Sequence, residues 1–312
     1  MSGRPIVLSQ LGRKHSDRLG EAFPEVDVVP ALAGDAMPDR ADVLVSAPWG
    51  RDLLPRLIAD TGVAWVHTVS TGVDALDLDL FRDGPALTCS RGGSAVPIAE
   101  WVLAQMLAFE KDLPARWITA PPEQWNLADL GTLDGRRVGL VGLGAIGSAI
   151  AHRAAAFGCR LRAVRRTGAP SDIESVEVTT DLPALVGWSD HLVLAAAATP
   201  DTHHLLGAEL LTDLGPGAHL VNIARGSLVD QEALRAALDD GRVARASLDV
   251  VDPEPLPAGH WLFAHPSVRL SAHVSWSAPG SWERLVDGFH TNLRRWLDDD
   301  DLEGTVDLDA GY

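Results

Sequence analysis

Three polar side chains that could catalyse hydride transfer follow three short apolar segments in the last third of the chain. Arg225 follows the segment ending at Asn222, Glu254 follows Leu248, and His273 ends the third segment. Reducing a 2-keto acid with a nicotinamide needs a cation for the carboxylate and the polarised carbonyl, and a proton donor for the developing alkoxide. It also needs a carboxylate that holds the donor in one tautomer and keeps it protonated. Arginine, histidine and glutamate meet these needs.

Each of these residues also has an ordinary structural interpretation. Arg225 suits a strand-end cap or an ion pair, Glu254 stands between prolines in a surface loop, and His273 is one of eleven histidines. The carboxyl ends of parallel strands line the ligand crevice of an α/β sheet. Three such residues on three successive strand ends therefore favour a catalytic site.

The glycine spacing of a dinucleotide site lies earlier in the chain. A strand over Val138–Val141 leads into Gly142-Leu-Gly-Ala-Ile-Gly147, then a small-residue helix over Ser148–Phe157 and a strand over Leu161–Val164. The first glycine permits a tight turn, the second a close approach of the pyrophosphate, and the third close packing of the helix. The helix amino terminus would bind the phosphates. The predicted cofactor-binding positions of this loop are Gly142, Gly144, Ala145, Ile146 and Gly147.

The end of the second strand indicates which dinucleotide binds. An NAD site usually carries a carboxylate there for the ribose 2′-hydroxyl, whereas this chain has Arg165, Arg166 and Thr167. Guanidinium groups grip a 2′-phosphate through paired hydrogen bonds. We therefore expect NADP(H) to be preferred, with NAD(H) as the alternative if the two arginines are only solvated surface residues.

The amino-acid composition indicates which binding partners and which cellular compartment to expect. The 312 residues suffice for two domains, and the formal net charge of −17 disfavours nucleic acid and anionic membranes as partners. There are two cysteines, no apolar segment of transmembrane length, and an amino-terminal apolar run too short for a signal peptide, so we expect a cytoplasmic protein. No metal site is expected, because adjacent His203 and His204 would point apart and no further ligand spacing completes a site.

The elements that must position these residues form two alternating patterns of strands and helices, which predict an α/β fold with parallel sheets. A largely apolar helix over Val96–Glu110 separates the patterns and is expected to be buried between domains or subunits. Asp230 is predicted to cap a helix over Gln231–Asp239. Further helices are expected over Asp52–Asp60 and Ser281–Leu297. The other expected strands are Ile6–Leu8, Val26–Val29, Val43–Ser46, Trp65–Thr68, Leu87–Cys89, His191–Leu194, His219–Asn222 and Ala246–Val250.

Five motifs, in this order, resemble those of the D-isomer-specific 2-hydroxyacid dehydrogenase family. They are Gly142–Gly147, Thr199–Thr202, Asn222–Asp230, Leu248–Pro255 and Ser271–His273. The chain length and the Arg-Arg-Thr strand ending resemble the glyoxylate/hydroxypyruvate reductase branch. The resemblance implies that Arg225, Glu254 and His273 are catalytic in the roles given above.

The resemblance also implies further site residues and a domain plan. Thr202, Ala224 and Asp249 would contact the cofactor, and Ser70, Thr71 and Gly72 would bind the substrate carboxylate together with Arg225. Two Rossmann-like domains are implied: a flavodoxin-like substrate-binding domain from residues 1–98 and 277–312, and an inserted NAD(P)-binding domain over residues 99–276. Two cofactor domains would pair in a homodimer.

The expected function is reduction of small 2-keto acids, of the glyoxylate and hydroxypyruvate type, to D-2-hydroxy acids with NAD(P)H and His273 as acid/base. Two alternatives stay open: a dinucleotide-sensing, corepressor-like interaction protein, and a dehydrogenase of an unusual donor such as formate or phosphite. The sequence does not place the residues that select the substrate's side chain, although Trp49 and Trp276 are candidates.

Overall fold

The computed structural model describes residues 3–312. They divide into two α/β units. Unit 1 comprises the residues up to Ser94 together with Pro279–Tyr312, and unit 2 comprises Ala95–Ala278. The sequence prediction set these boundaries after residues 98 and 276. The roles assigned to the two units, substrate binding and cofactor binding, stay predictions.

Unit 1 is built on a five-stranded sheet in which every pairing is parallel and the order is β2-β1-β3-β4-β5. This is the flavodoxin-like order, and it confirms the predicted fold class. All four residues of β3 and of β4 are buried, as expected of central strands covered on both faces. The strands are β1 (Ile6–Ser9), β2 (Asp27–Pro30), β3 (Val43–Ser46), β4 (Trp65–Thr68) and β5 (Ala86–Cys89).

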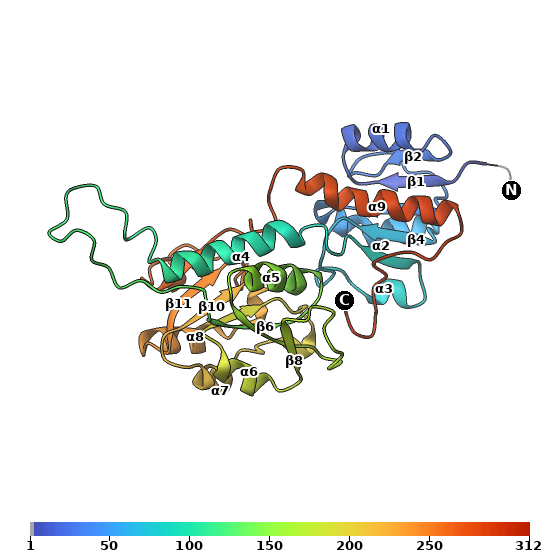
Figure 1. Ribbon diagram of the computed structural model, residues 1–312. Helices are drawn as coiled ribbons and strands as arrows, with labels where there is room; N and C mark the ends of the chain where they lie inside the picture. Colours follow the sequence, from blue (N-terminus) through green and yellow to red (C-terminus); the bar gives the residue numbers. More distant parts are fainter. Residues whose placement is uncertain (1–2) are drawn as a thin grey trace. The chain divides into compact units, whose positions relative to one another are not determined.

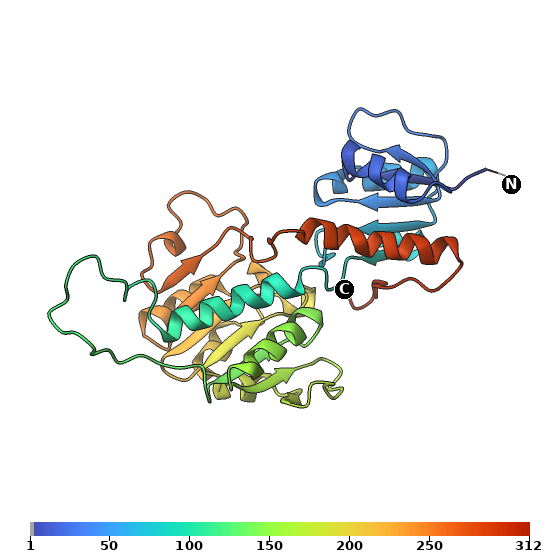
Figure 2. The ribbon, with the colours of Figure 1, turned by 45° about the horizontal axis from the view of Figure 1, so that its top comes forward.

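The helices of unit 1 include α9 (Ser281–Leu297), which returns from the far end of the sequence to cover one face of this sheet (Figure 2). Its buried Phe289 stacks on Trp65 of β4, with ring centroids 5.6 Å apart. The helix predicted over Asp52–Asp60 starts earlier, as a 3-10 turn that Pro48 opens, and continues as α2. The other elements are α1 (Arg13–Ala22), η1 (Pro48–Leu53), α2 (Leu54–Thr61) and α3 (Asp79–Arg82).

Unit 2 is built on a seven-stranded parallel sheet in the order β12-β11-β10-β9-β6-β7-β8. The order reverses between β6 and β9, as in the dinucleotide-binding Rossmann fold. The strands are β6 (Arg137–Val141), β7 (Arg160–Val164), β8 (Val176–Thr179), β9 (His191–Leu194), β10 (Ala218–Asn222), β11 (Val243–Leu248) and β12 (Val268–Leu270).

Helices cover both faces of the sheet of unit 2 (Figure 1). On one face, Met106 and Ile150 pack with sheet residues such as Leu140. On the other, Leu185 and Leu234 belong to a second buried cluster. The first face carries α4 (Ala95–Glu110) and α5 (Ala145–Ala156), and the second carries α6 (Leu182–Trp188), α7 (Ala208–Asp213) and α8 (Gln231–Asp239).

Some predicted element bounds were right and others were wrong. Helices α8 and α9 have the predicted bounds, and the Asp230 carboxylate caps α8 as expected. Helix α5 begins at Ala145, earlier than predicted, because Gly144 is its N-cap. Strand β11 covers Val243–Leu248 instead of Ala246–Val250. Within residues 3–312, no helix is long and apolar enough to cross a membrane.

A segment without helix or strand, residues 111–136, joins α4 to β6 and extends away from the sheet of unit 2 in both views (Figures 1 and 2). Two contacts hold the beginning and the end of this segment close together, at what we call its base. Lys111 Nζ donates to Gly131 O at 2.7 Å, and Arg136 Nε lies 2.8 Å from Glu110 Oε1. The segment exposes five large apolar side chains: Trp117, Ile118, Trp125, Leu127 and Leu130.

Candidate active site

Backbone hydrogen bonds tie together the loops that follow β10, β11 and β12. Asp249 N–H donates to Asn222 O at 3.0 Å, and His273 N–H donates to Asp249 O at 2.8 Å. Three loops that are distant in sequence thus meet at the carboxyl edge of one sheet, where open α/β sheets bind ligands. These loops carry the three residues predicted to be catalytic.

Glu254 and His273 are in direct contact at this edge. His273 Nδ1 lies 2.8 Å from Glu254 Oε1, and the two side chains are 39% and 37% exposed. His273 adopts a positive φ of 53°, and Trp276 Nε1–H donates to its carbonyl oxygen at 3.1 Å. A ring whose Nδ1 bonds a carboxylate leaves Nε2 to exchange a proton with a ligand. The pair therefore has the geometry and solvent access of a general acid–base pair.

Arg225 lies on the loop next to this pair. Its Nη1 donates to Ala224 O at 2.7 Å, and its own carbonyl accepts from Asn222 Nδ2 at 2.9 Å. The following residue must be glycine, because a Cβ on Gly226 would lie 1.9 Å from the carbonyl carbon of Val251. The Arg225 loop is thereby packed against the segment that leads to Glu254.

Asp249 has a structural role that the sequence did not reveal. Its carboxylate is buried, with Oδ1 accepting from Val274 N at 2.9 Å and from Ser271 Oγ at 2.5 Å, and Oδ2 accepting from Ser275 N at 3.0 Å. Both oxygens thus hold the loop that carries His273. The contact with the cofactor implied for Asp249 stays a prediction.

The glycine-rich loop after β6 lies at the point where the strand order reverses. Gly142 has a φ of 102°, and a Cβ there would lie 2.7 Å from Ala195 O. A Cβ on Gly147 would lie 2.3 Å from Gly142 O, whereas one on Gly144 would meet nothing within 4 Å. Two glycines therefore allow the tight turn, and the third, with Ala145 and Ile146 after it, presents open backbone at the start of α5. This loop fits a dinucleotide pyrophosphate.

The Arg165 side chain, which follows β7, is hydrogen-bonded to the same loop. Its Nη2 donates to Leu143 O at 3.0 Å and its Nη1 to Pro170 O at 3.0 Å, so this guanidinium is more than a solvated surface group. Arg166 and Thr167 beside it are exposed, and the Thr167 hydroxyl accepts from Ala169 N at 3.3 Å. The strand end thus presents cationic and hydroxyl groups beside the glycines.

The two remaining predicted cofactor positions of unit 2 are held by local hydrogen bonds. Thr202 Oγ1 donates to Ala197 O at 2.9 Å and accepts from Thr199 N at 2.8 Å, which caps the short turn η2 (Pro200–Thr202). Ala224 is buried, and its N–H donates to Asn222 Oδ1 at 3.0 Å. Both residues stay predicted cofactor contacts.

The predicted substrate-binding loop belongs to unit 1, where it follows β4. Ser70 Oγ donates to Gly72 O at 2.8 Å, and Ser70 O accepts from Ser90 N at 3.0 Å. Among residues 3–312, the N–H groups of Thr71 and Gly72 have no hydrogen-bond acceptor. This loop can therefore offer two adjacent backbone donors to an anion.

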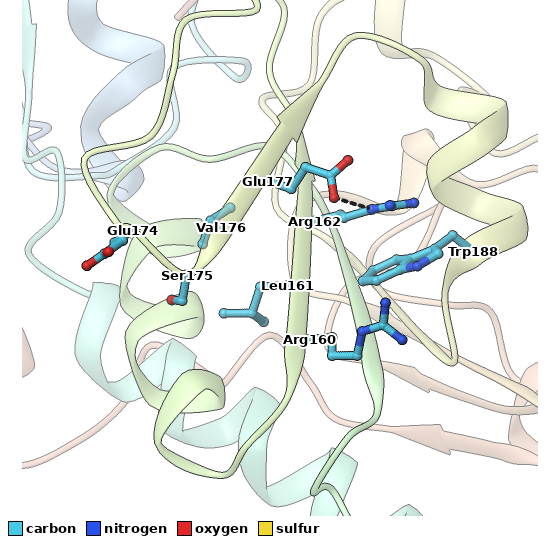
Figure 3. A pocket seen from close by; sticks show the side chains of 8 residues that line it. All are labelled: Arg160, Leu161, Arg162, Glu174, Ser175, Val176, Glu177 and Trp188. Carbon is cyan, nitrogen blue, oxygen red and sulfur yellow. Dashed lines mark hydrogen bonds and ion pairs between the residues drawn. The ribbon is translucent and has the colours of Figure 1, made fainter.

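A hollow lined by Arg160, Arg162, Glu177 and Trp188, among others, lies at the amino end of β7, at the edge opposite the glycine loop (Figure 3). Arg162 there pairs with Glu177 at 2.8 Å and lies over the Trp188 ring.

The expectation that His203 and His204 point apart is wrong. Their rings stack with centroids 4.1 Å apart, because His204 adopts a φ of 49°. No group of three or more metal-ligating side chains occurs in the part of the chain that the structure describes.

Comparison with known proteins gives concordant matches. The family model "D-isomer specific 2-hydroxyacid dehydrogenase, NAD binding domain" matches residues 103–275. The chain is 32% identical to a glyoxylate/hydroxypyruvate reductase B of Pectobacterium atrosepticum over 275 residues, which cover 82% of this chain and 83% of the relative. The predicted resemblance to this family and to its glyoxylate/hydroxypyruvate reductase branch is confirmed.

Two solved structures resemble this chain in both fold and sequence. An NADPH-dependent glyoxylate/hydroxypyruvate reductase from Sinorhizobium meliloti, crystallised with NADP and sulfate, aligns with a TM-score of 0.84 at 26% identity and covers 99% of this chain and 100% of its own. A D-isomer specific 2-hydroxyacid dehydrogenase from Xanthobacter autotrophicus, in complex with NADPH and MES, gives a TM-score of 0.81 at 29% identity over 100% of both chains.

Proposed function

Because the chain belongs to the D-isomer specific 2-hydroxyacid dehydrogenase family, we propose that it is an NADPH-preferring reductase of small 2-keto acids. Glyoxylate and hydroxypyruvate represent the substrate class, and the products are D-2-hydroxy acids. The observation that carries the proposal is the 2.8 Å contact between His273 Nδ1 and Glu254 Oε1 at the carboxyl edge of unit 2. The same edge bears the glycine loop that fits a dinucleotide.

The three side chains have different tasks in this reaction. When bound, the dinucleotide supplies the hydride that reduces the keto carbon. Arg225 binds the substrate carboxylate and donates to the keto oxygen through its paired N–H groups. His273 donates a proton from Nε2 to the keto oxygen as it becomes a hydroxyl, and Glu254 orients the ring from Nδ1. Oxidation of the hydroxy acid runs the same transfers in reverse.

Ser70, Thr71 and Gly72 are proposed to contribute backbone N–H donors for the substrate carboxylate. The support is the pair of N–H groups at Thr71 and Gly72 described above. Thr202, Ala224 and Asp249 are proposed to lie along the cofactor, as the family resemblance implies.

The test of the proposed function is an assay that follows NADPH absorbance with glyoxylate, hydroxypyruvate and phenylpyruvate. We expect turnover of at least one of them and a product of D configuration. Binding of NADPH without turnover of any keto acid would contradict the proposal and favour a corepressor-like protein. Dinucleotide reduction with formate or phosphite alone would favour the unusual-donor alternative.

The preference for NADP(H) is proposed to come from Arg165, Arg166 and Thr167. Two solved relatives hold NADP or NADPH, and the Arg165 guanidinium bonds the carbonyl of Leu143 inside the glycine loop. Arg165→Asp should shift the ratio of kcat/KM for NADPH over NADH by at least about tenfold toward NADH. Arg153→Asp, in the last turn of α5, is the matched control and should leave the ratio unchanged. A constant ratio in Arg165→Asp would remove this proposal.

We also propose that the protein is a cytoplasmic homodimer whose 111–136 segment contacts the second copy. Trp117, Trp125 and Leu127 are exposed on this segment, and clustered apolar side chains of this size mark interaction surfaces. Cys89 and Cys159 are both free thiols, which suits a reducing compartment. Sedimentation of the purified chain should show a dimer, and replacing both Trp117 and Trp125 by serine should weaken it. A wild-type monomer would contradict the assembly.

A further inference from the structure

Ser90, which directly follows β5, is hydrogen-bonded both to the proposed carboxylate-binding loop and to α9. Its N–H donates to Thr68 O at 3.2 Å, at the end of β4, and to Ser70 O at 3.0 Å, at the start of that loop. Its hydroxyl donates to Leu285 O in α9 at 2.6 Å. Ser90 is only 3% exposed. One buried residue thus links a loop and a helix that lie far apart in the sequence.

His67 determines the direction in which the Ser90 hydroxyl donates. His67 Nε2 lies 3.0 Å from Ser90 Oγ. A serine hydroxyl has one proton and a carbonyl oxygen can only accept, so that proton lies between Ser90 Oγ and Leu285 O. Nε2 must then donate to Ser90 Oγ. If the ring proton were on Nδ1 instead, Ser90 would donate to Nε2, and the 2.6 Å contact with Leu285 O would contain no hydrogen bond.

The other ring nitrogen of His67 fits the same tautomer. Thr88 Oγ1 lies 2.7 Å from His67 Nδ1 and accepts from Trp65 Nε1–H at 2.9 Å, so its own proton is available for Nδ1. Burial lowers the pKa of His67 to about 3, so the ring is neutral at neutral pH and carries its one proton on Nε2. Four hydrogen bonds therefore run in one direction, from the Trp65 indole to the Leu285 carbonyl.

The carboxylate-binding loop is fixed internally as well. Ser70 Oγ donates to Gly72 O at 2.8 Å and therefore accepts from Thr68 Oγ1 at 3.1 Å. The carbonyl oxygen of Ser70 accepts from Ser90 N–H. These bonds hold Ser70 without using the N–H groups of Thr71 and Gly72. The loop can therefore present both donors to an anion in an orientation that is set beforehand.

The turn that begins at Ser90 packs closely on α9. A Cβ on Gly93 would lie 2.9 Å from Leu285 Cδ2 and 3.4 Å from Arg284 O, and Gly93 N–H donates to Ser90 O at 3.3 Å. A Cβ on Gly288, on the next turn of α9, would lie 3.5 Å from Ser90 Oγ. Ser90 thus lies against two successive turns of the helix, which gives its hydroxyl a rigid support.

We propose that Ser90 is a positioning residue for the substrate carboxylate, which holds the Ser70–Gly72 loop through its N–H and fastens that loop to α9 through its hydroxyl. His67, as the Nε2–H tautomer, directs the hydroxyl toward the helix. The Thr71 and Gly72 donors are then already oriented when a carboxylate binds. This inference rests on the proposed function, to which it adds a residue that positions the carboxylate-binding loop.

The first test compares Ser90→Ala with the wild type, using NADPH and the best of the three 2-keto acids named above. Loss of the hydroxyl releases the turn from α9, so the KM for the keto acid should rise at least about threefold, with kcat and the KM for NADPH unchanged. Ser189→Ala is the matched control, because Ser189 is 2% exposed and its Oγ donates to Leu185 O of α6 at 2.7 Å in unit 2. It should leave all three constants unchanged.

A second test reads the tautomer of His67 directly and needs no activity. Nuclear magnetic resonance of protein with isotopically labelled histidine distinguishes protonated from unprotonated ring nitrogens. The signals of His67 are assigned by their absence in His67→Phe. We expect a protonated Nε2 and an unprotonated Nδ1 at neutral pH. A proton on Nδ1 would reverse the hydrogen-bond chain and overturn the inference.

The outcomes separate this inference from the proposed function. If Ser90→Ala lost stability but kept the KM of the wild type, or lost kcat without a change in KM, Ser90 would not position the carboxylate. Either result would overturn the inference while the reductase activity stands. A wild type that reduces no 2-keto acid would overturn the proposed function and the inference with it.

Discussion

Unit 2 contains two glutamate–histidine pairs with nearly the same contact and opposite surroundings. His273 Nδ1 lies 2.8 Å from Glu254 Oε1, and both side chains are more than a third exposed. His191 Nε2 lies 3.0 Å from Glu110 Oε1, and these side chains are 0% and 2% exposed. The first pair stands beyond the carboxyl ends of β11 and β12, whereas His191 is the first residue of β9, at the amino end.

The buried pair belongs to a longer chain of hydrogen bonds. His191 Nδ1 meets His219 Nδ1 at 3.0 Å, and His219 Nε2 meets Ser247 Oγ at 3.0 Å. Burial opposes ionisation of Glu110, yet hydrogen bonds from His191 and Arg136 outweigh it and hold the pKa of Glu110 below its ordinary value. Burial, followed by the nearby His191 and Arg245, lowers the pKa of His219 well below its ordinary value.

If the proposed function holds, the residue types and the contact distance do not by themselves make an acid–base pair. A proton donor must reach a ligand, and only the pair at the carboxyl edge has solvent access beside a ligand-binding loop. The buried chain instead satisfies polar groups inside the sheet and, through Arg136, fastens the base of the 111–136 segment. The contrast predicts that removing His273 affects turnover, whereas removing Glu110 affects stability.

The largest expected effect is that of His273→Ala on turnover. Loss of the proton donor should lower kcat by about 10²- to 10⁴-fold, while the half-exposed position should leave the melting temperature nearly unchanged. Steady-state kinetics and thermal unfolding of the same preparation measure both. His265→Ala is the matched control. His265 also pairs with a carboxylate, since its Nε2 lies 3.3 Å from Asp239 Oδ1, but it is not one of the predicted site residues. Near-normal turnover in His273→Ala would show that His273 is not the proton donor, so the two pairs would not differ in function in this way.

Glu110→Ala should give the opposite result. It removes a buried carboxylate from two partners and should lower the free energy of unfolding by about 3–5 kcal/mol. Urea unfolding measures this loss, and turnover per folded molecule should stay near that of the wild type. Glu177→Ala breaks the exposed Arg162 pair and should cost less than about 1 kcal/mol. Wild-type stability in Glu110→Ala would show that the buried chain contributes little.

His67 of unit 1 sharpens the comparison, because it is a buried histidine whose ring bonds only hydroxyl groups. Its nitrogens meet Thr88 Oγ1 at 2.7 Å and Ser90 Oγ at 3.0 Å, and burial lowers the pKa of His67 to about 3. The unfolded chain then binds this proton below about pH 6.5 and the folded chain does not, so stability is full above that pH and is lost as the pH falls toward 3.

Between about pH 7.5 and about pH 5, His67 should account for about 2 kcal/mol of lost stability. His67→Phe should reduce the pH dependence of the unfolding free energy by that amount, whatever its effect at neutral pH. Urea unfolding at the two pH values measures the difference. If the variant had the same pH dependence as the wild type, His67 would bind its proton in the folded chain as readily as in the unfolded chain.

The sequence predicted that the three candidate residues follow strand ends at one edge of the sheet because its signals are local. Glycine spacing and polar residues after apolar runs mark the strand ends, and parallel pairing then brings Arg225, Glu254 and His273 to one edge whatever the packing elsewhere. The short strand β8 and the helices α6 and α7 were missed. Their apolar positions, such as Val176 and Leu185, are too few to establish a period over four to seven residues.

The buried chain was missed for a different reason. Its hydrogen bonds join residues 81 and 28 positions apart, and histidine or glutamate in a sequence indicates a polar surface unless a partner is known. One signal was present, since the predicted strands His191–Leu194 and His219–Asn222 each begin with histidine. Parallel strands that pair with His219 opposite His191 place these rings side by side.

Among residues at the carboxyl edge, the smallest expected effect is that of Asp230→Ala, which asks whether position alone makes a carboxylate catalytic. Asp230 lies on the same strand-end loop as Arg225, yet its Oδ1 accepts from Glu232 N and Ala233 N at 3.1 Å as the N-cap of α8. Losing this cap should cost about 1 kcal/mol in urea unfolding and leave kcat unchanged, and Asp230→Asn should restore most of the stability. A fall in kcat of about tenfold or more, with the stability intact, would place Asp230 in the chemistry. Proximity to the edge would then outweigh the hydrogen-bond partners that separate a cap from an acid–base pair.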